Sequence, residues 1–232
     1  KFDVMMNWIC DNWIEVFGAV AGIIYVFLEI RQNILLWPVG IVTSAVYIYV
    51  FFTGKIYADM TLQGYYLVIS FIGWYWWIRG TSSQRSRETQ DNQGMSRGED
   101  EKKGSLRVTR ISFCTGIIVS CVFFLLVTVI WLILSRLTDS PVPLWDSIIT
   151  SLSIVATWML ARKIYEHWFL WIVVNILSVG LFLTRGLFPT MILYMVYFIM
   201  SFAGLVEWKK TMIKEPGGAA GSQNPEKVVI SN

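Results

Sequence analysis

The fold of this chain is decided by residues 59–77, DMTLQGYYLVISFIGWYWW, and residues 190–208, TMILYMVYFIMSFAGLVEW. Matching or related residues stand 131 positions apart, at Gln63 and Tyr194, Tyr66 and Tyr197, Ser70 and Ser201, Gly73 and Gly204, and Trp77 and Trp208. Both sets advance by three or four residues, which places each set on one face of an α-helix. Polar groups in a helix surrounded by lipid face protein or a water-filled cavity. The pattern therefore predicts a duplicated helix bundle around a central site.

The composition places the chain in a membrane. Of its 232 residues, 55% are hydrophobic and 15% are charged, whereas about one quarter of a soluble chain is charged. We expect seven apolar spans long enough to cross a bilayer, at residues 14–30, 34–52, 60–78, 111–134, 144–161, 168–184 and 188–207. The predicted fold class is an all-α membrane protein with seven transmembrane helices.

The basic residues predict the orientation of these spans. With seven spans, fifteen of the nineteen Lys and Arg residues fall on the side of the C-terminus. Because cytoplasmic loops are enriched in Lys and Arg, we expect the C-terminus in the cytoplasm and the N-terminus outside. Residues 79–110 and 209–232 are polar and have no apolar period, so we expect a disordered cytoplasmic linker and a cytoplasmic tail.

The duplication extends beyond the two stretches. Trp37 and Ser44 are matched here with Trp171 and Ser178, at an offset of 134. The predicted parts are a first three-helix repeat, a connector helix and a second three-helix repeat, at residues 14–78, 111–134 and 144–208. Three spans followed by one extra span bring the second repeat into the membrane in the same direction as the first. We therefore expect a parallel 3+1+3 repeat, as in SWEET-type transporters. Accidental similarity of aromatic-rich segments is the alternative.

Seven residues are predicted to line the central site, because each lies on the polar or aromatic face of its span: Gln63, Tyr66, Trp168, Trp171, Asn175, Tyr194 and Tyr197. An isolated Asn or Gln in hydrocarbon costs several kcal/mol unless its hydrogen bonds are made. Hydrogen bonding between helices is the alternative role for the amides and tyrosines, and an interfacial aromatic belt is the alternative for Trp168. His167, the only histidine, is expected at the cytoplasmic mouth of its span, as an interfacial polar residue or as a titrating gate.

Several chemistries have no support in the sequence. No Lys, Arg, Asp or Glu occupies the centre of a predicted span, so we expect no proton relay. No pattern indicates an enzyme nucleophile, a phosphate loop, a metal site or a nucleic-acid interface. We therefore expect neither an enzyme nor a cofactor. Aromatic faces combined with amides and hydroxyls suit a flat, polar or cationic ring, which favours a carrier for a small molecule.

Four motifs resemble the family of PnuC-type vitamin transporters: LWPVGI at 36–41, KIYADM at 55–60 with Gln63 beyond it, GWYWW at 73–77, and the pattern formed by Trp168, Trp171 and Asn175. The resemblance covers about 14–80 and 144–208. It implies a SWEET-like 3+1+3 fold and the facilitated diffusion of nicotinamide riboside, an NAD precursor, through the bacterial inner membrane. It also implies that a cytosolic kinase then traps the vitamin, and that Trp168, Trp171, Asn175 and Gln63 bind it.

Other functions stay open at this point. The resemblance also covers transport of thiamine or riboflavin, because relatives are thought to carry these flat vitamins. A seven-span receptor that binds the same ligand without moving it is the alternative from another class, and a membrane scaffold protein is a third. The sequence leaves the oligomeric state open, and a homo-oligomer is compatible with it.

Overall fold

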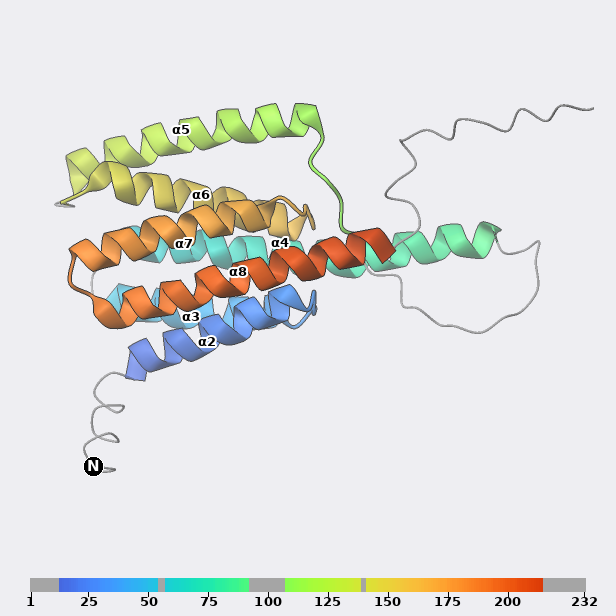
Figure 1. Cartoon of the computed structure of the whole chain (residues 1–232), viewed down its shortest axis with the longest axis horizontal. Helices are drawn as coiled ribbons and strands as arrows, with labels where there is room; N and C mark the ends of the chain where they lie inside the picture. Colours follow the sequence, from blue (N-terminus) through green and yellow to red (C-terminus); the bar gives the residue numbers. More distant parts are fainter. Residues whose placement is uncertain (1–12, 54–56, 92–106, 139–140, 215–232) are drawn as a thin grey trace, which may run out of the picture.

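The computed structural model describes residues 13–53, 57–91, 107–138 and 141–214. This part of the chain holds seven α-helices: α2 (Trp13–Ile30), α3 (Leu36–Thr53), α4 (Tyr57–Asp91), α5 (Phe113–Leu137), α6 (Pro143–Ala161), α7 (His167–Thr184) and α8 (Phe188–Lys214). They run side by side in one bundle, with α5 at its edge (Figure 1). Each helix begins within three residues of the start predicted for a span. The all-helical prediction is therefore confirmed for the described residues.

Two helices continue well past the ends predicted for their spans. α4 runs to Asp91 rather than 78, and α8 runs to Lys214 rather than 207. The extension of α4 occupies the first part of the stretch expected to be a disordered linker. Loss of hydropathy ends a membrane span, but it does not end a helix, because residues such as Gln, Arg and Glu have good helix propensity. The rest of the expected linker, 92–106, and the tail from 215 on lie outside the described residues.

Five of the described helices are long and apolar enough to cross a membrane, on length and composition. They lie at Leu36–Thr53, Phe113–Leu137, Pro143–Ala161, His167–Thr184 and Phe188–Ile213. The apolar part of α2, Val16–Ile30, is shorter. Large hydrophobic side chains are exposed on the outside of the bundle on all seven helices, as expected where the solvent is lipid. The described residues thus support a multi-pass membrane protein.

The helix contacts follow one pattern in the two parts of the chain. α3 packs against α2 and α4, and α7 packs against α6 and α8. Between the two groups, α2 contacts α8 and α4 contacts α6. Exchanging α2 with α6, α3 with α7 and α4 with α8 therefore leaves the set of contacts unchanged. α5 contacts α6 among the described helices and has no buried residue.

The turns after α2 and α6 have the same backbone hydrogen bonds. Gln32 N donates to Glu29 O at 3.0 Å, and Lys163 N donates to Leu160 O at 2.9 Å. The next residue in each turn donates to the carbonyl five residues back, at 2.9 Å in both cases. Gln32 and Lys163 both have a φ of 52°, the left-handed conformation that closes a helix in a Schellman motif. All these atoms correspond at an offset of 131 residues.

The packing of two tryptophans corrects two predicted pairings, those of Trp37 and Ser44. A Cβ atom at Gly73 would clash with the Trp37 ring, and a Cβ atom at Gly204 would clash with the Trp168 ring. Both contacts correspond at the offset of 131 found in the turns, so the counterpart of Trp37 is Trp168 and not Trp171. The counterpart of Ser44 is likewise Asn175 rather than Ser178. Trp168 and Trp171 lie one helical turn apart on α7, so periodicity alone could not distinguish them.

A short extended segment before α5 is tied to the α6–α7 turn. Thr109 N donates to Lys163 O at 3.0 Å, and Tyr165 N donates to Thr109 O at 2.9 Å. Ile111 N donates to Glu166 Oε2 at 3.0 Å. The last residues of the predicted linker are therefore ordered against the bundle. In Figure 1 this contact lies at the same end as the α2–α3 turn and the C-terminal parts of α4 and α8.

Candidate functional site

A cavity of about 290 Å³ lies inside the bundle. Six helices line it, which are all the described helices except α5. All seven residues predicted for the central site are on its wall: Gln63, Tyr66, Trp168, Trp171, Asn175, Tyr194 and Tyr197. The volume is at the lower end of the ~300–1,000 Å³ typical of small-molecule sites. The structure thus brings the predicted residues together, and their binding of a ligand stays a prediction.

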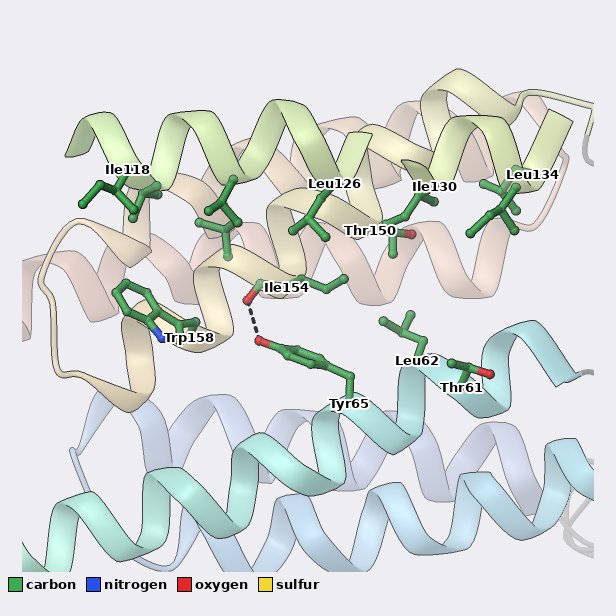
Figure 2. A pocket seen from close by; sticks show the side chains of 14 residues that line it. Thr61, Leu62, Tyr65, Ile118, Leu126, Ile130, Leu134, Thr150, Ile154 and Trp158 are labelled. Atoms are coloured by element: carbon green, nitrogen blue, oxygen red, sulfur yellow. Dashed lines mark hydrogen bonds between the residues drawn. The ribbon is translucent and has the colours of Figure 1, made fainter. Parts of the chain in front are cut away.

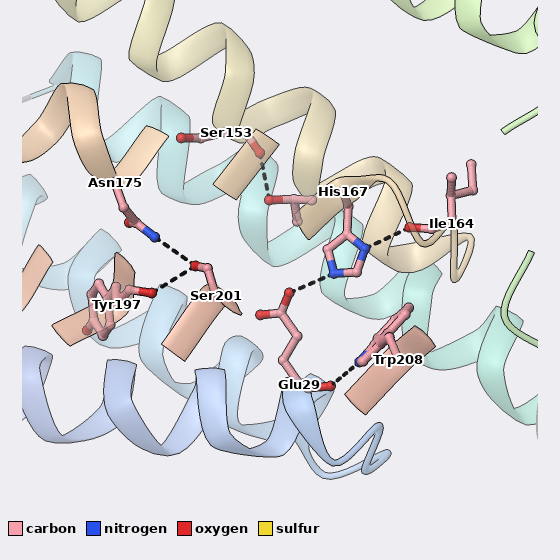
Figure 3. Close-up of polar contacts among 9 residues, drawn as sticks. Glu29, Ser153, Ile164, His167, Asn175, Tyr197, Ser201 and Trp208 are labelled. Carbon is pink, nitrogen blue, oxygen red and sulfur yellow. Dashed lines mark hydrogen bonds and ion pairs between the residues drawn. The ribbon is translucent and has the colours of Figure 1, made fainter. Parts of the chain in front are cut away.

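Asn175 is held in place by a hydrogen bond between α7 and α8. Its Nδ2 donates to Ser201 Oγ at 3.0 Å, and Ser201 Oγ donates to Tyr197 O at 2.8 Å (Figure 3). The amide nitrogen is used by Ser201, while the amide oxygen has no partner among the described residues. Because that oxygen lies in a residue on the cavity wall, it can accept a hydrogen bond from a ligand. Both roles weighed for the amide, interhelical contact and cavity wall, apply to Asn175.

The tyrosines of α8 line the cavity, and Tyr197 reaches as far as α2. The hydroxyl of Tyr197 occupies the place where a Cβ atom at Gly22 would lie. The Tyr194 ring packs against Phe182 and Tyr197, with centroids 5.2 and 5.7 Å away. These contacts fix the direction of both rings, which leaves their exposed faces available for stacking on a flat ligand.

The two tryptophans of α7 differ in their surroundings. Trp168 is almost fully buried and packs against Gly204 and Trp208, so its main contacts are with protein. Its indole N–H has no acceptor among the described residues, but the same holds for Trp37, which lies off the cavity wall. Trp37 and Trp168 pack against matched glycines, and both leave the indole N–H without an acceptor in the described part of the chain. The unpaired N–H of Trp168 therefore follows from this packing and does not indicate a ligand. The belt interpretation of Trp168 is wrong, because an interfacial ring would not be buried in this way.

Trp171 gives a clearer indication of a ligand. It is half-buried on the cavity wall, and its buried N–H also has no acceptor among the described residues. Its counterpart in the first part of the chain is Gly40, so shared packing cannot explain this donor. A buried donor without an acceptor costs about 1–3 kcal/mol. A ligand or water that accepts from Trp171 would remove this cost.

Glu29 and His167 were missed as a site. Glu29 lines the cavity, and its Oε1 lies 3.1 Å from His167 Nε2 (Figure 3). Both side chains are buried, with 2% and 0% of the surface exposed. His167 is packed between Trp168 and Trp208, so the interfacial interpretation of His167 is wrong. The stripe of Gly18, Gly22 and Tyr25 on α2 reaches Glu29 at its next step, and this signal could have found the carboxylate.

A second and larger cavity lies between α5 and the helices α4 and α6. Its volume is about 890 Å³, and its wall is almost entirely apolar, with Ile118, Leu126 and Leu134 among its residues (Figure 2). The Tyr65 hydroxyl, which points toward it, donates to Ile154 O at 2.8 Å. None of the predicted site residues lies here, and the wall offers few polar groups to orient a polar ligand. The inner cavity is therefore the candidate site.

The described residues contain no group of three His, Cys, Asp or Glu side chains that could hold a metal ion. The inner cavity offers aromatic rings, hydroxyls, two amides and one carboxylate instead. Such a set can hold a ligand by stacking, hydrogen bonding and charge.

Comparisons with known proteins agree with this geometry. A model of the nicotinamide mononucleotide transporter family matches residues 12–210. Over 206 residues the chain is 27% identical to the nicotinamide riboside transporter PnuC of Escherichia coli (strain K12), with 85% of each chain covered. It is 24% identical over 213 residues to the riboflavin/roseoflavin transporter RibM of Streptomyces davaonensis, covering 88% of this chain and 92% of that protein. The crystal structure of the vitamin B3 transporter PnuC is similar, with a TM-score of 0.65 and 25% identity over 90% of this chain and 86% of that one.

Proposed function

The chain belongs to the nicotinamide mononucleotide transporter family, and we propose that it carries nicotinamide riboside or a close vitamin analogue by facilitated diffusion. The observation that carries this proposal is the inner cavity, which six helices enclose with rings, amides and hydroxyls. A site for a polar ring at the centre of a membrane bundle is what a carrier of such a molecule requires. The substrate named for the Escherichia coli relative supports the choice of nicotinamide riboside.

The substrate is held in this proposal by residues of both α7 and α4. The ring stacks on the aromatic wall, and Trp171 donates its N–H to an oxygen of the substrate. Asn175 and Gln63 form hydrogen bonds with the amide and the ribose hydroxyls. Tyr66, Tyr194 and Tyr197 close the cavity around the ring, and the buried Trp168 forms part of the wall.

The transport movement in this proposal is a rocking of two parallel three-helix repeats, α2–α4 and α6–α8, with α5 as connector in a SWEET-like 3+1+3 order. The matched turns and the exchangeable helix contacts support it. The cavity lies between the two repeats, so a small rotation of one repeat against the other opens it to one side at a time. All seven helices, including α2 and α4, span the membrane.

The proposed orientation follows from the basic residues. The chain spans a bacterial inner membrane with its N-terminus outside and its C-terminus in the cytoplasm. The α2–α3 and α6–α7 turns and the ends of α4 and α8 gather at one end of the bundle (Figure 1). These segments carry nine of the nineteen Lys and Arg residues, and this supports one cytoplasmic face. A cytosolic kinase that phosphorylates the vitamin would keep it inside and maintain the gradient.

Riboflavin is the second candidate, because the Streptomyces davaonensis relative is named for it. Its three fused rings need more room than the single ring of nicotinamide riboside. A cavity of about 290 Å³ favours the smaller vitamin. Thiamine, with two separate rings, lies between them.

Counterflow in proteoliposomes tests the proposed function. Vesicles loaded with unlabelled nicotinamide riboside should take up labelled nicotinamide riboside from outside, and empty vesicles should take up much less. A receptor that binds the ligand without moving it would show binding but no counterflow. Riboflavin and thiamine are measured in parallel, and uptake of either one alone would assign the chain to that vitamin instead.

A further inference from the structure

Among the described residues on the wall of the inner cavity, Glu29 is the one carboxylate, and no Lys or Arg accompanies it. We infer that Glu29 recognises the positive charge of a cationic ring, and that His167 is a positioning residue that holds the carboxylate in place. This inference rests on the proposed function and deepens it, because it assigns the charge of the substrate to one side chain.

The hydrogen bonds of His167 define the state of the pair. Its Nδ1 lies 2.7 Å from Ile164 O, and a carbonyl oxygen only accepts, so Nδ1 carries a hydrogen. Its Nε2 lies 3.1 Å from Glu29 Oε1, and one more hydrogen must lie between these atoms. The pair is therefore an imidazolium with a carboxylate or an imidazole with a carboxylic acid. In both arrangements the pair as a whole is uncharged.

The second carboxylate oxygen is available to a ligand. Glu29 Oε2 has no hydrogen-bond partner among the described residues, and it points away from His167 (Figure 3). When the carboxylate is ionised, the negative end of the pair is toward the cavity and the imidazolium lies behind it. A cationic ring is then attracted more weakly than by a lone carboxylate. This suits a carrier, which must also release its substrate.

The counterpart of this pair shows that the fold does not need charge here. At the offset of 131 residues, Glu29 corresponds to Leu160 and His167 corresponds to Leu36. Both leucines are fully buried and belong to one hydrophobic cluster. An apolar pair therefore fills the equivalent place in the bundle. Because a buried ion pair is often no more stable than well-packed apolar residues, stability alone does not account for Glu29 and His167.

The closest competing role is a tie between helices. Glu29 on α2 and His167 on α7 connect the two three-helix groups, and Trp208 Nε1 donates to Glu29 O at 3.0 Å. That last bond uses the backbone, so it survives replacement of the Glu29 side chain. The side chain can thus be varied while this link is kept.

The test compares a charged ligand with an uncharged one of nearly the same shape. Nicotinamide riboside carries a pyridinium cation, and its reduced dihydro form keeps the amide and the ribose on an uncharged ring. Affinity of the purified full-length protein is measured for both by calorimetry. Glu29→Gln should weaken binding of the cation roughly 10- to 100-fold, because it removes the negative charge that attracts the pyridinium ring, and the imidazolium behind the carboxylate already offsets part of that attraction. Binding of the reduced form should change less than about twofold, within the range of a surface change.

A double variant provides the matched control. Glu29→Leu combined with His167→Leu reproduces the apolar pair found at Leu160 and Leu36. It should fold, elute as the wild type does and keep its melting temperature, yet bind the charged and uncharged ligands with similar affinity. His167→Gln, whose amide still donates to Glu29, should keep the preference for the cation.

Equal weakening of both ligands by Glu29→Gln would overturn the inference, because it would show a structural role. Unchanged binding of the cation would overturn it as well. The inference would also be contradicted if the wild-type protein bound uncharged vitamins such as riboflavin but bound neither nicotinamide riboside nor thiamine, which are both cations. This holds even if transport itself is confirmed. Failure of counterflow with intact charge preference would instead contradict the proposed function alone.

Discussion

The two groups of three helices share their packing and differ at the cavity wall. Trp37 and Trp168, Gly73 and Gly204, and Ser70 and Ser201 make equivalent contacts. On the wall, by contrast, Gly40 and Ser44 of α3 correspond to Trp171 and Asn175 of α7. The shared residues hold helices together in both groups. The differing residues place an indole N–H and an amide on α7, where α3 has a glycine and a serine.

The two groups of helices also differ in the pair formed by Glu29 and His167 at the end of the cavity. Glu29 on α2 corresponds to Leu160 on α6, and His167 on α7 corresponds to Leu36 on α3. One polar pair and one apolar pair thus occupy equivalent places in one bundle. The packing is therefore equivalent in the two groups of helices, whereas the cavity wall differs between them. Substitutions at matched positions can distinguish an effect on packing from an effect on the wall.

The largest effect is expected from filling the space beside the shared tryptophans. Gly73→Val and Gly204→Val should each lower the free energy of unfolding by about 3 kcal/mol or more, because each added side chain clashes with a buried ring. Melting temperature and yield of monodisperse protein measure this. Gly64→Val is the control, since among the described residues no atom beyond its chain neighbours and the backbone of its own helical turns lies within 4 Å of its Cβ position. Loss of stability at one glycine only would show that the two halves do not share this packing.

The next effect separates Asn175 from its counterpart. Asn175→Ala should weaken binding of nicotinamide riboside by about 1–3 kcal/mol, since it removes the amide from the wall. Ser44→Ala, the matched change in α3, should leave affinity within about twofold. Calorimetry on both purified variants measures the difference. Similar losses in the two variants would place the ligand on the axis between the halves rather than against α7.

A smaller effect is expected from the indole N–H of Trp171. Trp171→Phe keeps an aromatic ring and removes the donor, and affinity should fall about fivefold, or ~1 kcal/mol, for one hydrogen bond. Trp37→Phe removes an unpaired N–H away from the cavity and should alter stability but not affinity. If Trp171→Phe binds as the wild type does, the ring stacks on the ligand without donating to it.

The smallest effect concerns two serines of the cavity wall, Ser70 and Ser201, whose hydroxyls donate to backbone carbonyls of their own helices. Ser201→Ala removes the acceptor of Asn175 Nδ2 and should weaken binding by about 0.5–1.5 kcal/mol. Ser70→Ala removes the matched bond to Tyr66 O, where no amide depends on it, and should leave affinity unchanged. Equal effects would show that these bonds stabilise the helices alone.

Part of the site could be predicted because helical periodicity is a local property. Gln63, Tyr66, Asn175, Tyr194 and Tyr197 are polar or aromatic at spacings of three and four in apolar segments, and such groups must face inward in lipid. The structure places all five on the cavity wall. The length of α4 was misjudged, because the prediction followed hydropathy, and helix propensity continues where hydropathy ends.

Other features depend on contacts between distant residues. Glu29 and His167 are 138 positions apart, and each lies at the end of its own helix, where a charged residue is ordinary in any membrane span. Nothing local distinguishes Trp168 from Trp171 either, since both lie on one face of α7. The contact with Gly204 decides which of them is the counterpart of Trp37.

The sequence by itself determined that the chain is an all-helical membrane bundle with an inward polar face, because the 3.6-residue period and the exclusion of polar groups from lipid act within each helix. Only the tertiary structure decided the register of the two parts, the burial of His167 and the presence of a carboxylate on the cavity wall. These depend on which helices meet and at what height, and that is set by the packing of large rings against small residues far away in the chain.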